Sequence, residues 1–436
     1  MAHIKIKKGL NIPIKGGSAK EMGQLPFPKR VACDLSPFHR VKLHLKVKEG
    51  QHVDAGNPIA EDRESPGLFF VSHVSGTVVE VRRGARRRVL SVVIECDEKQ
   101  TQRPFTGDDV IPLMKEGGIF PHITQRPGGK MASPEKMPRS IFVQGLSSAP
   151  FDAPVNLEIE AHKEAFQAGL TALSSIAPVH LVVREGAASF NDVTTHTISG
   201  PHPIENPSIH IYHIDPIMDV TDVIWTIKAP SVIALGQLIS EKTIYATRPI
   251  ALCGEGVELD KRGIYQGLIG HPIEELPLNF DESYRVISGN PLLGTETDRE
   301  GFLGFFDRAV SVIPRPQKRQ MLHFMRLGLN KFTATRTYLS RLIGRKAPYS
   351  FTTLKHGEER AFIDGAIYQD VMPMKIPVMQ LIKALIAEDY ELAMELGLLE
   401  VAEEDFILPE FVCPSKIPMT EIVRSKLKDF SEGYLH

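Results

Sequence analysis

The pattern of hydrophobic and polar residues changes along the chain and predicts a different kind of structure in each part. Residues 1–103 carry short β-rich runs that alternate apolar and polar positions between glycine turns. Residues 104–255 alternate strand-like and helix-like runs, residues 256–330 read as a small mixed unit, and residues 331–436 are mostly helical. We therefore expect a multidomain α/β protein with domain boundaries near these positions.

Residues 104–255 show the succession of runs that is typical of an α/β layer. The stretches 141–144 and 179–183 predict short buried strands, and apolar spacing over 157–176 predicts a helix. We further expect a helix at 218–226 and an apolar strand at 231–235. Because helices alternate with strands here, the sequence favours a parallel sheet.

Residues 1–103 contain two segments that resemble the halves of a biotinyl/lipoyl-like barrel-sandwich hybrid. Residues 47–59 hold two glycines around a valine, and residues 71–81 alternate around a central glycine. A carrier domain of this type needs a lysine at the tip of the hairpin between the halves. The intervening residues 61–67 offer Arg63 and no lysine, so we expect the fold without the carrier function.

Residues 256–330 and the remainder of the chain predict two further units. A strand within 285–294 ends in a Gly-Asn-Pro turn, which fits a compact β-grasp-like module. Beyond it, amphipathic spacing predicts helices at 378–387, 390–396 and 419–430.

Composition narrows the classes of function. The chain has 436 residues, 24% of them charged, and a formal net charge of -2, so nothing points to nucleic acid as a partner. Residues 1–8 alternate like a strand rather than a signal peptide, and no run approaches the about 18 apolar residues of a membrane-spanning helix. The cysteines stand singly, which suits a reducing compartment and excludes a Cys-x-x-Cys zinc or iron–sulfur motif; they are Cys33, Cys96, Cys253 and Cys413.

Three histidines between residues 200 and 217 are the most chemically suggestive cluster. Imidazole is the commonest protein ligand for transition metals, so His202, His210 and His213 raise the possibility of a metal site. However, the β-branched run 209–214 predicts a strand, whose alternation would point His210 and His213 to opposite faces. An independent zinc protein is therefore a low-ranked hypothesis, and we expect no metal.

A nucleotide-binding version of the α/β layer would need a glycine-rich loop between a strand and its helix. The nearest candidate is Pro127-Gly-Gly-Lys130, which lacks the Gly-x-Gly-x-x-Gly spacing and is more typical of a surface turn. Flavin or NAD binding on this chain is accordingly disfavoured.

Residues 82–88 place five arginines on one predicted turn. Charge runs most often face water on a solvated hairpin, which is the favoured interpretation. The alternative is an electrostatic contact with an acidic partner protein or with anionic lipid headgroups.

Several motifs in consistent order resemble the A subunits of Na+-translocating NADH:quinone reductases over essentially the whole length. The ends of the resemblance are residues 4–10 and 411–414. Its most specific motifs are Gly200-Pro-His-Pro203, His210-Ile-Tyr-His-Ile-Asp-Pro216, Arg285-Val-Ile-Ser-Gly289, Gly357-Glu-Glu-Arg360 and Val371-Met-Pro373.

The resemblance implies a fold of four parts: a barrel-sandwich hybrid (1–103), a Rossmann-like α/β domain (104–255), a soluble-ligand-binding β-grasp domain (256–330) and a helical C-terminal domain (331–436). It also implies a peripheral subunit on the cytoplasmic side of the bacterial inner membrane, in a six-subunit complex that passes electrons from NADH to ubiquinone and exports Na+. Contact with the membrane would come only through partner subunits. FMN and iron–sulfur clusters are expected on partner subunits, and no covalent cofactor on this one.

A quinone site needs an apolar slot and one or two hydrogen-bonding groups for the carbonyl oxygens. The candidates are His202, His210, Tyr212 and Trp225, and His210 and Tyr212 would share a face if 209–214 is a strand. Cys413 reads as a small buried hydrophobe. The alternative hypothesis is a non-catalytic scaffold subunit of the same complex that binds no quinone. A role like that of Rnf-type reductases is disfavoured by the few cysteines.

Overall fold

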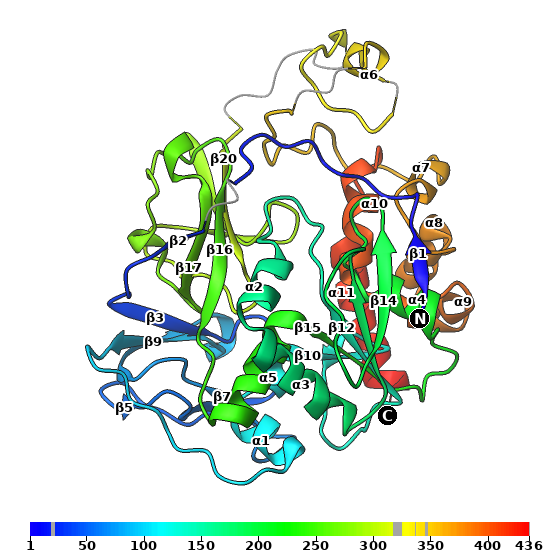
Figure 1. Ribbon diagram of the computed structural model, residues 1–436. Coiled ribbons are helices and arrows are strands. Elements are labelled where there is room, and N and C mark those ends of the chain that lie inside the picture. Colours follow the sequence, from blue (N-terminus) through cyan, green and yellow to red (C-terminus); the bar gives the residue numbers. More distant parts are fainter. Residues whose placement is uncertain (19–21, 317–324, 336, 345–347, 436) are drawn as a thin grey trace.

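The computed structural model describes residues 1–435 apart from 19–21, 317–324, 336 and 345–347 (Figure 1). The N-terminal barrel region consists of two small sheets of antiparallel strands. Val78, Val92 and Ile94 from its longest strands are fully buried between the sheets, because alternate residues of a strand point to one face. One sheet has the order β3 (Arg30–Asp34), β9 (Val89–Cys96), β8 (Gly76–Arg83), β5 (His52–Val53), and the other β4 (Leu43–Leu45), β6 (Pro58–Asp62), β7 (Phe69–Val71).

The α/β layer is built on a seven-stranded sheet. Its parallel part confirms the prediction of a parallel sheet, and the strands predicted at 141–144 and 179–183 are present. The sheet also recruits the N-terminal strand β1, which pairs in parallel with β14. The order is β1 (His3–Lys5), β14 (Thr194–Ser199), β13 (Val179–Val183), β12 (Ser140–Gln144), β15 (Ile224–Lys228), then antiparallel β10 (Ile123–Arg126) and β11 (Lys130–Met131).

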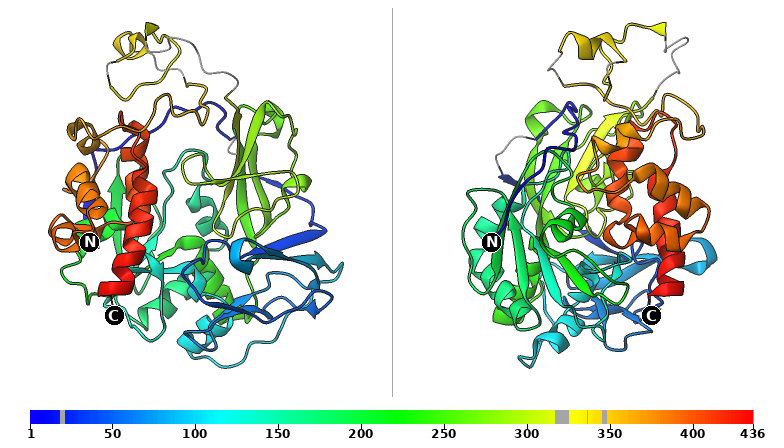
Figure 2. Two further views of the ribbon diagram at one scale, coloured as in Figure 1. Left: turned by 180° about the vertical axis from the view of Figure 1, so that it is seen from behind. Right: turned by 90° about the vertical axis from the view of Figure 1, so that its right-hand side faces the viewer.

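Helices cover both faces of this sheet. Because successive residues of a strand point to opposite faces, their side chains pack into two separate hydrophobic cores. On one face Ile141 and Trp225 pack with α2 (Val155–Ala161), α3 (Lys163–Ser174) and α5 (Ala229–Glu241). Helices α3 and α5 cross so closely that a Cβ at Gly236 would lie 1.7 Å from the Ala165 carbonyl oxygen. On the other face Phe142 packs with the C-terminal helices, drawn in orange and red in Figure 2.

The predicted C-terminal helices at 378–387, 390–396 and 419–430 are confirmed, the last one longer than expected. They are α8 (Val378–Ile386), α9 (Tyr390–Glu395) and α11 (Met419–Tyr434), joined by α10 (Ile407–Val412) and preceded by the short α6 (Leu339–Leu342) and α7 (Ala366–Gln369). Within the described ranges, no helix is long and apolar enough to cross a membrane.

A second, six-stranded sheet lies beside the α/β layer (Figure 1). It draws strands from both sides of residue 255 and from the N-terminus, since β2 pairs with β17. The predicted strand before the Gly-Asn-Pro turn is β18. The order is β19 (Thr295–Thr297), β18 (Tyr284–Ser288), β20 (Ala309–Pro314), β16 (Thr247–Cys253), β17 (Gly263–Leu268), β2 (Met22–Gln24).

Three predicted elements around the histidine cluster are wrong. The run 209–214 is not a strand but lies in helix α4 (Pro207–Ile214), which starts with a proline at its first position, where no backbone N–H is needed. The predicted helix at 218–226 is replaced by strand β15, and the predicted strand at 231–235 lies within helix α5. The apolar runs were located correctly, but their type was assigned from β-branched composition rather than from the proline positions.

Candidate functional site

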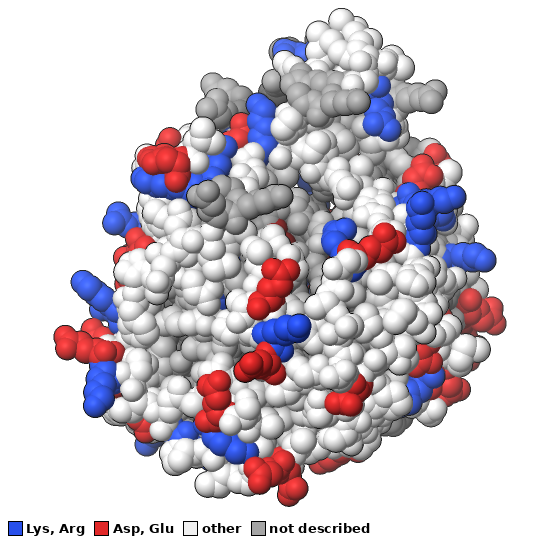
Figure 3. Space-filling model, in the orientation of Figure 1, with Lys and Arg blue, Asp and Glu red and all other residues white. Residues whose placement is uncertain are grey.

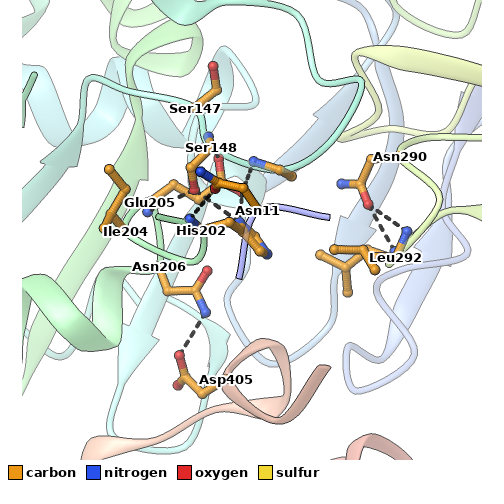
Figure 4. A network of polar contacts seen from close by, with 12 residues as sticks. Asn11, Ser147, Ser148, His202, Ile204, Glu205, Asn206, Asn290, Leu292 and Asp405 are labelled. Carbon is orange, nitrogen blue, oxygen red and sulfur yellow. Dashed lines mark hydrogen bonds and ion pairs between the residues drawn. The ribbon is translucent and has the colours of Figure 1, made fainter. Parts of the chain in front are cut away.

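The candidate site lies where loops leave the carboxyl ends of the parallel strands. In chain order β12, β13, β14 and β15 occupy the spatial order β14-β13-β12-β15, so the direction of winding reverses between β12 and β15. Ligands of open α/β sheets bind outside the carboxyl ends of the strands at such a reversal. Here the loops after β1, β12 and β14 bring together Asn11, Ser148, His202 and Glu205 (Figure 4).

His202 is held in this cluster from several directions. Its Nδ1 lies 3.0 Å from Ser148 Oγ, and its backbone N–H donates to Asn11 Oδ1 over 2.9 Å. Its carbonyl accepts the Leu10 N–H. The ring is buried, and loss of water around it lowers the His202 pKa to about 4, so the imidazole is neutral near pH 7.

The Ser148 hydroxyl can donate to His202. The Glu205 backbone N–H donates to Ser148 Oγ over 3.3 Å, which leaves the hydroxyl proton free to point at His202 Nδ1. In that arrangement the neutral imidazole accepts at Nδ1 and carries its proton on Nε2, which is then a hydrogen-bond donor.

The side chain of Glu205, from the loop after β14, reaches into the turn that follows β12. Its carboxylate accepts the Ser148 N–H at 2.6 Å and the Ala149 N–H at 3.2 Å. In dinucleotide-binding folds the amides of this turn hold the phosphates. A phosphate entering here would have to displace Glu205, and the turn carries no Gly-x-Gly-x-x-Gly run.

The same carboxyl group is set up to exchange a proton near neutral pH. Burial, reinforced by the nearby Asp152 charge, raises the pKa of Glu205 to about 7, although Lys228 and the two amides act in the opposite direction. Its Oε1 lies 3.7 Å from His202 Nδ1. The site thus pairs a carboxyl group of raised pKa with a neutral histidine of lowered pKa, an arrangement found where protons are transferred.

His210 supports the site from behind rather than facing it. Its fully buried ring donates from Nε2 to the Ile204 carbonyl over 2.7 Å, which fixes the loop that carries His202 and Glu205. Asn206 also anchors this loop. Its side-chain amide donates to Asp405 Oδ1 over 2.8 Å, which ties the loop to the C-terminal helices.

The other predicted site residues lie apart from this cluster. Tyr212 is partly buried, and its ring centroid lies 5.2 Å from that of His213. The strand prediction required Tyr212 and His210 to share a face, but 209–214 is a helix, so they do not. Trp225 is fully buried on the opposite face of the sheet, where it meets Phe120 at 5.5 Å.

The described residues contain no group of three or more histidines, cysteines or carboxylates that could hold a metal ion. His213 is exposed whereas His210 is buried against Ile204. Strand alternation, the predicted reason for separating these two histidines, was wrong, and helix α4 separates them by burial instead. Cys413 is buried, as predicted, and lies 3.1 Å from the Tyr368 hydroxyl.

The turn Pro127-Gly-Gly-Lys130 connects β10 to β11, so it is a hairpin turn and not a strand-to-helix loop. Gly128 and Gly129 have φ of 93° and 61°, values that favour glycine. Asn11, Ser148 and Glu205 were not among the predicted site residues. Asn11 and Ser148 follow runs predicted as strands, and Glu205 lies within the histidine-containing stretch 200–217.

Together the fold and the site define an α/β protein with an N-terminal barrel region, in which the chain's own carboxylate fills the usual phosphate-binding turn. Models of two domains match the chain: the NqrA N-terminal barrel-sandwich hybrid domain over residues 4–97 and the NqrA second alpha/beta domain over residues 105–244. The first of these confirms the predicted barrel-sandwich hybrid.

Full-length relatives agree. The A subunit of the Na(+)-translocating NADH-quinone reductase of Chlamydia caviae is 37% identical, and the match covers 98% of this chain and 97% of the relative. That of Rhodopirellula baltica is 33% identical, with 97% of each chain covered. The chain belongs to the family of A subunits of the Na(+)-translocating NADH-quinone reductase.

Proposed function

We propose that the chain is a peripheral subunit of a Na+-translocating NADH:ubiquinone oxidoreductase that contributes to quinone binding. Family membership supports its place in such a complex. We place it on the cytoplasmic side of the inner membrane among six subunits, with FMN and iron–sulfur clusters on its partners. The strand order supports a Rossmann-like α/β domain, and the six-stranded sheet would include the β-grasp unit.

The chain of hydrogen bonds through Ser148, His202 and Glu205 is the observation that carries the quinone proposal. A quinone carbonyl is an acceptor without a proton, and His202 Nε2 supplies a matching donor. Reduction of a quinone to a quinol also takes up protons. Glu205, with its pKa near 7, is suited to supply or relay one within reach of His202.

The remaining candidates take different parts in this proposal. His210 positions the loop through the Ile204 carbonyl and does not touch the quinone. Tyr212 lies on the same helix and would contribute to the apolar surroundings. Trp225 lies across the sheet and would act only as a fluorescent reporter of the α/β layer.

Photolabelling with a reactive ubiquinone analogue tests the proposal in the intact complex and in the purified full-length chain. His202→Leu removes the Nε2–H donor and should weaken saturable labelling of the chain about tenfold, the value of one hydrogen bond of about 1.4 kcal/mol. His213→Leu is the matched control, because that side chain is exposed on α4, and labelling should stay unchanged.

Folding of each variant is checked by circular dichroism before labelling. Absence of saturable labelling in the wild-type chain, in the complex as well as in isolation, would contradict quinone binding and favour the scaffold alternative. Equal labelling of wild type and His202→Leu would show that the quinone does not bind at this cluster.

A further inference from the structure

The barrel region has a basic hollow of about 340 Å³ that the quinone proposal does not involve. This volume lies within the about 300–1,000 Å³ typical of small-molecule sites. The lining of the hollow combines apolar and cationic side chains. Its apolar members are Phe38, Val41, Leu43, Leu45 and Val89, its arginines are Arg63, Arg83, Arg87 and Arg88, and the lining also includes His39 and His44.

The arginines of the hollow differ from neighbouring cations in their partners. Among the residues that the structure describes, none of the four arginines forms an ion pair with a carboxylate, although neighbouring cations do: Lys42 pairs with Glu64 at 2.7 Å and Arg82 with Glu80 at 3.0 Å. Like charges gathered around one hollow repel each other, so the free energy of the cluster falls when an anion enters. On the face drawn in Figure 3, by contrast, acidic and basic side chains are interspersed.

The turn between β8 and β9 holds these arginines in place. Arg86 and Arg87 have φ of 54° and 60°, in the left-handed region that residues with side chains seldom adopt. Arg83 Nη1 donates to the Arg87 carbonyl over 3.1 Å, and Arg88 Nη2 donates to the Ser36 carbonyl. This bent turn therefore places the exposed side chains of Arg83, Arg87 and Arg88 along the lining of one hollow.

Arg63 reaches the hollow from another segment, just after β6, where its backbone N–H donates to the Lys42 carbonyl. Burial of the His39 ring lowers the His39 pKa, and the positive charges of Arg40 and Arg88 lower it further. Arginines from two separate segments of the barrel region, residue 63 and residues 83–88, thus line a single hollow.

We propose that this hollow binds a phosphate-bearing ligand. The phosphoryl oxygens of the ligand contact the arginines, and an adjoining apolar portion of the ligand contacts apolar lining residues such as Phe38. The guanidinium fork matches phosphate oxygens in pairs, and several guanidinium groups suit an anion with more than one charged oxygen. Such a group belongs either to the headgroup of an acidic phospholipid or to a soluble phosphoryl compound. The site is independent of quinone binding.

Binding to the full-length chain is measured with two probes: vesicles of phosphatidylcholine with and without phosphatidylglycerol, by cosedimentation, and inorganic pyrophosphate, by calorimetry. The test variant is R63Q/R87Q, since neither side chain makes another hydrogen bond or ion pair within the described residues. The matched control, R86Q/K99Q, removes the same charge from exposed positions of the barrel region that do not line the hollow.

We expect R63Q/R87Q to weaken the binding of at least one probe about tenfold or more, while R86Q/K99Q changes it less than about twofold. Binding of phosphatidylglycerol vesicles alone assigns the site to a lipid headgroup, and binding of pyrophosphate assigns it to a soluble ligand. An equal loss in both variants would show only general electrostatic attraction and would overturn the proposal, as would no binding of either probe by the wild type.

Discussion

Two buried polar clusters border the same helical layer, and each contains a buried carboxylate with a different kind of partner. In the junction cluster, Glu158 of α2 meets Arg308 at 2.9 Å and accepts from the Tyr245 hydroxyl at 3.0 Å. In the strand-end cluster, Glu205 meets two backbone amides and the neutral His202. A carboxylate buried with a guanidinium fastens two parts of a fold, whereas one buried among neutral donors retains a proton that it can exchange.

The junction cluster joins α2 to the six-stranded sheet. The side chains of Arg308 and Glu158 are 6% and 1% exposed. Beside them Arg248 donates to the carbonyls of Phe305 and Asp307 at 2.8 and 3.0 Å. The Glu158–Arg308 pair therefore links α2 to the segment before β20, whereas the Arg248 bonds hold β16 to that same segment.

The largest effect is expected from Arg308→Met, which leaves the Glu158 carboxylate buried without its guanidinium partner. Removal of one member of a buried pair costs about 3–5 kcal/mol of unfolding free energy. Urea denaturation measures this value. The matched control is Arg424→Met, which breaks an exposed pair with Glu403 at 2.7 Å and should cost less than about 1 kcal/mol. Similar losses in both variants would remove the contrast between a fastening pair and a surface pair.

The double variant Glu158→Leu with Arg308→Met sharpens the same point. With both charges gone, neither is left buried alone, so the double variant should be more stable than Arg308→Met by about 1–3 kcal/mol. The comparison is made in the same urea titrations. A double variant less stable than Arg308→Met would mean that the two side chains act independently.

Glu205 should give the next largest effect, visible as a dependence of stability on pH. Because its folded pKa of about 7 lies above its ordinary value of 4.5, the folded state binds the extra proton between these pH values. The stabilisation is complete below pH 4.5 and is lost as the pH rises through about 7. His202, whose pKa is lowered from 6.5 to about 4, works in the opposite direction between these two values, where stability rises with pH.

The difference in unfolding free energy between wild type and Glu205→Gln isolates the Glu205 contribution. This difference can fall with rising pH by at most about 1.4 kcal/mol per pH unit. We expect a smaller slope, because the Glu205 side chain is 20% exposed and solvent screens its charge. Glu98→Gln, at an exposed position, provides the control with no slope. A difference that stays constant between pH 4.5 and 7 would show that Glu205 is permanently ionised, like a paired carboxylate.

Sequence reasoning located the apolar runs better than it identified their type. The strands at 141–144 and 179–183 follow from predominantly apolar runs between polar turns. Ile209 and Ile211 imitate strand alternation, but the segment is helix α4, whose start is indicated by Asn206 followed by Pro207. In this segment β-branched composition favours a strand, whereas the proline position favours the start of a helix. The structure follows the proline position.

Pairings between distant segments could not be predicted in the same way. The three-residue strand β2 joins β17, more than 200 positions away, and nothing in its own sequence selects that partner. At the site, His202 was recognised from its unusual motif, whereas Ser148 and Asn11 are 54 and 191 residues away from it. Their roles come from the order of strands in the sheet, which single-sequence patterns do not encode.

Ser148→Ala is the smallest change that still tests the strand-end cluster. It removes the hydroxyl between the Glu205 N–H and His202 Nδ1, while the Ser148 backbone N–H remains available to the Glu205 carboxylate. The expected loss of unfolding free energy is about 1–1.5 kcal/mol, since one partly buried hydrogen-bond network loses its centre. Ser133→Ala is the control, because that hydroxyl accepts only a 3.3 Å bond at the exposed surface. The free His202 ring should also become easier to protonate from water, so its pKa, followed by NMR, should move toward 6.5. A His202 pKa that stays near 4 would show that burial alone sets it, and that the cluster differs from the junction only in lacking a guanidinium group.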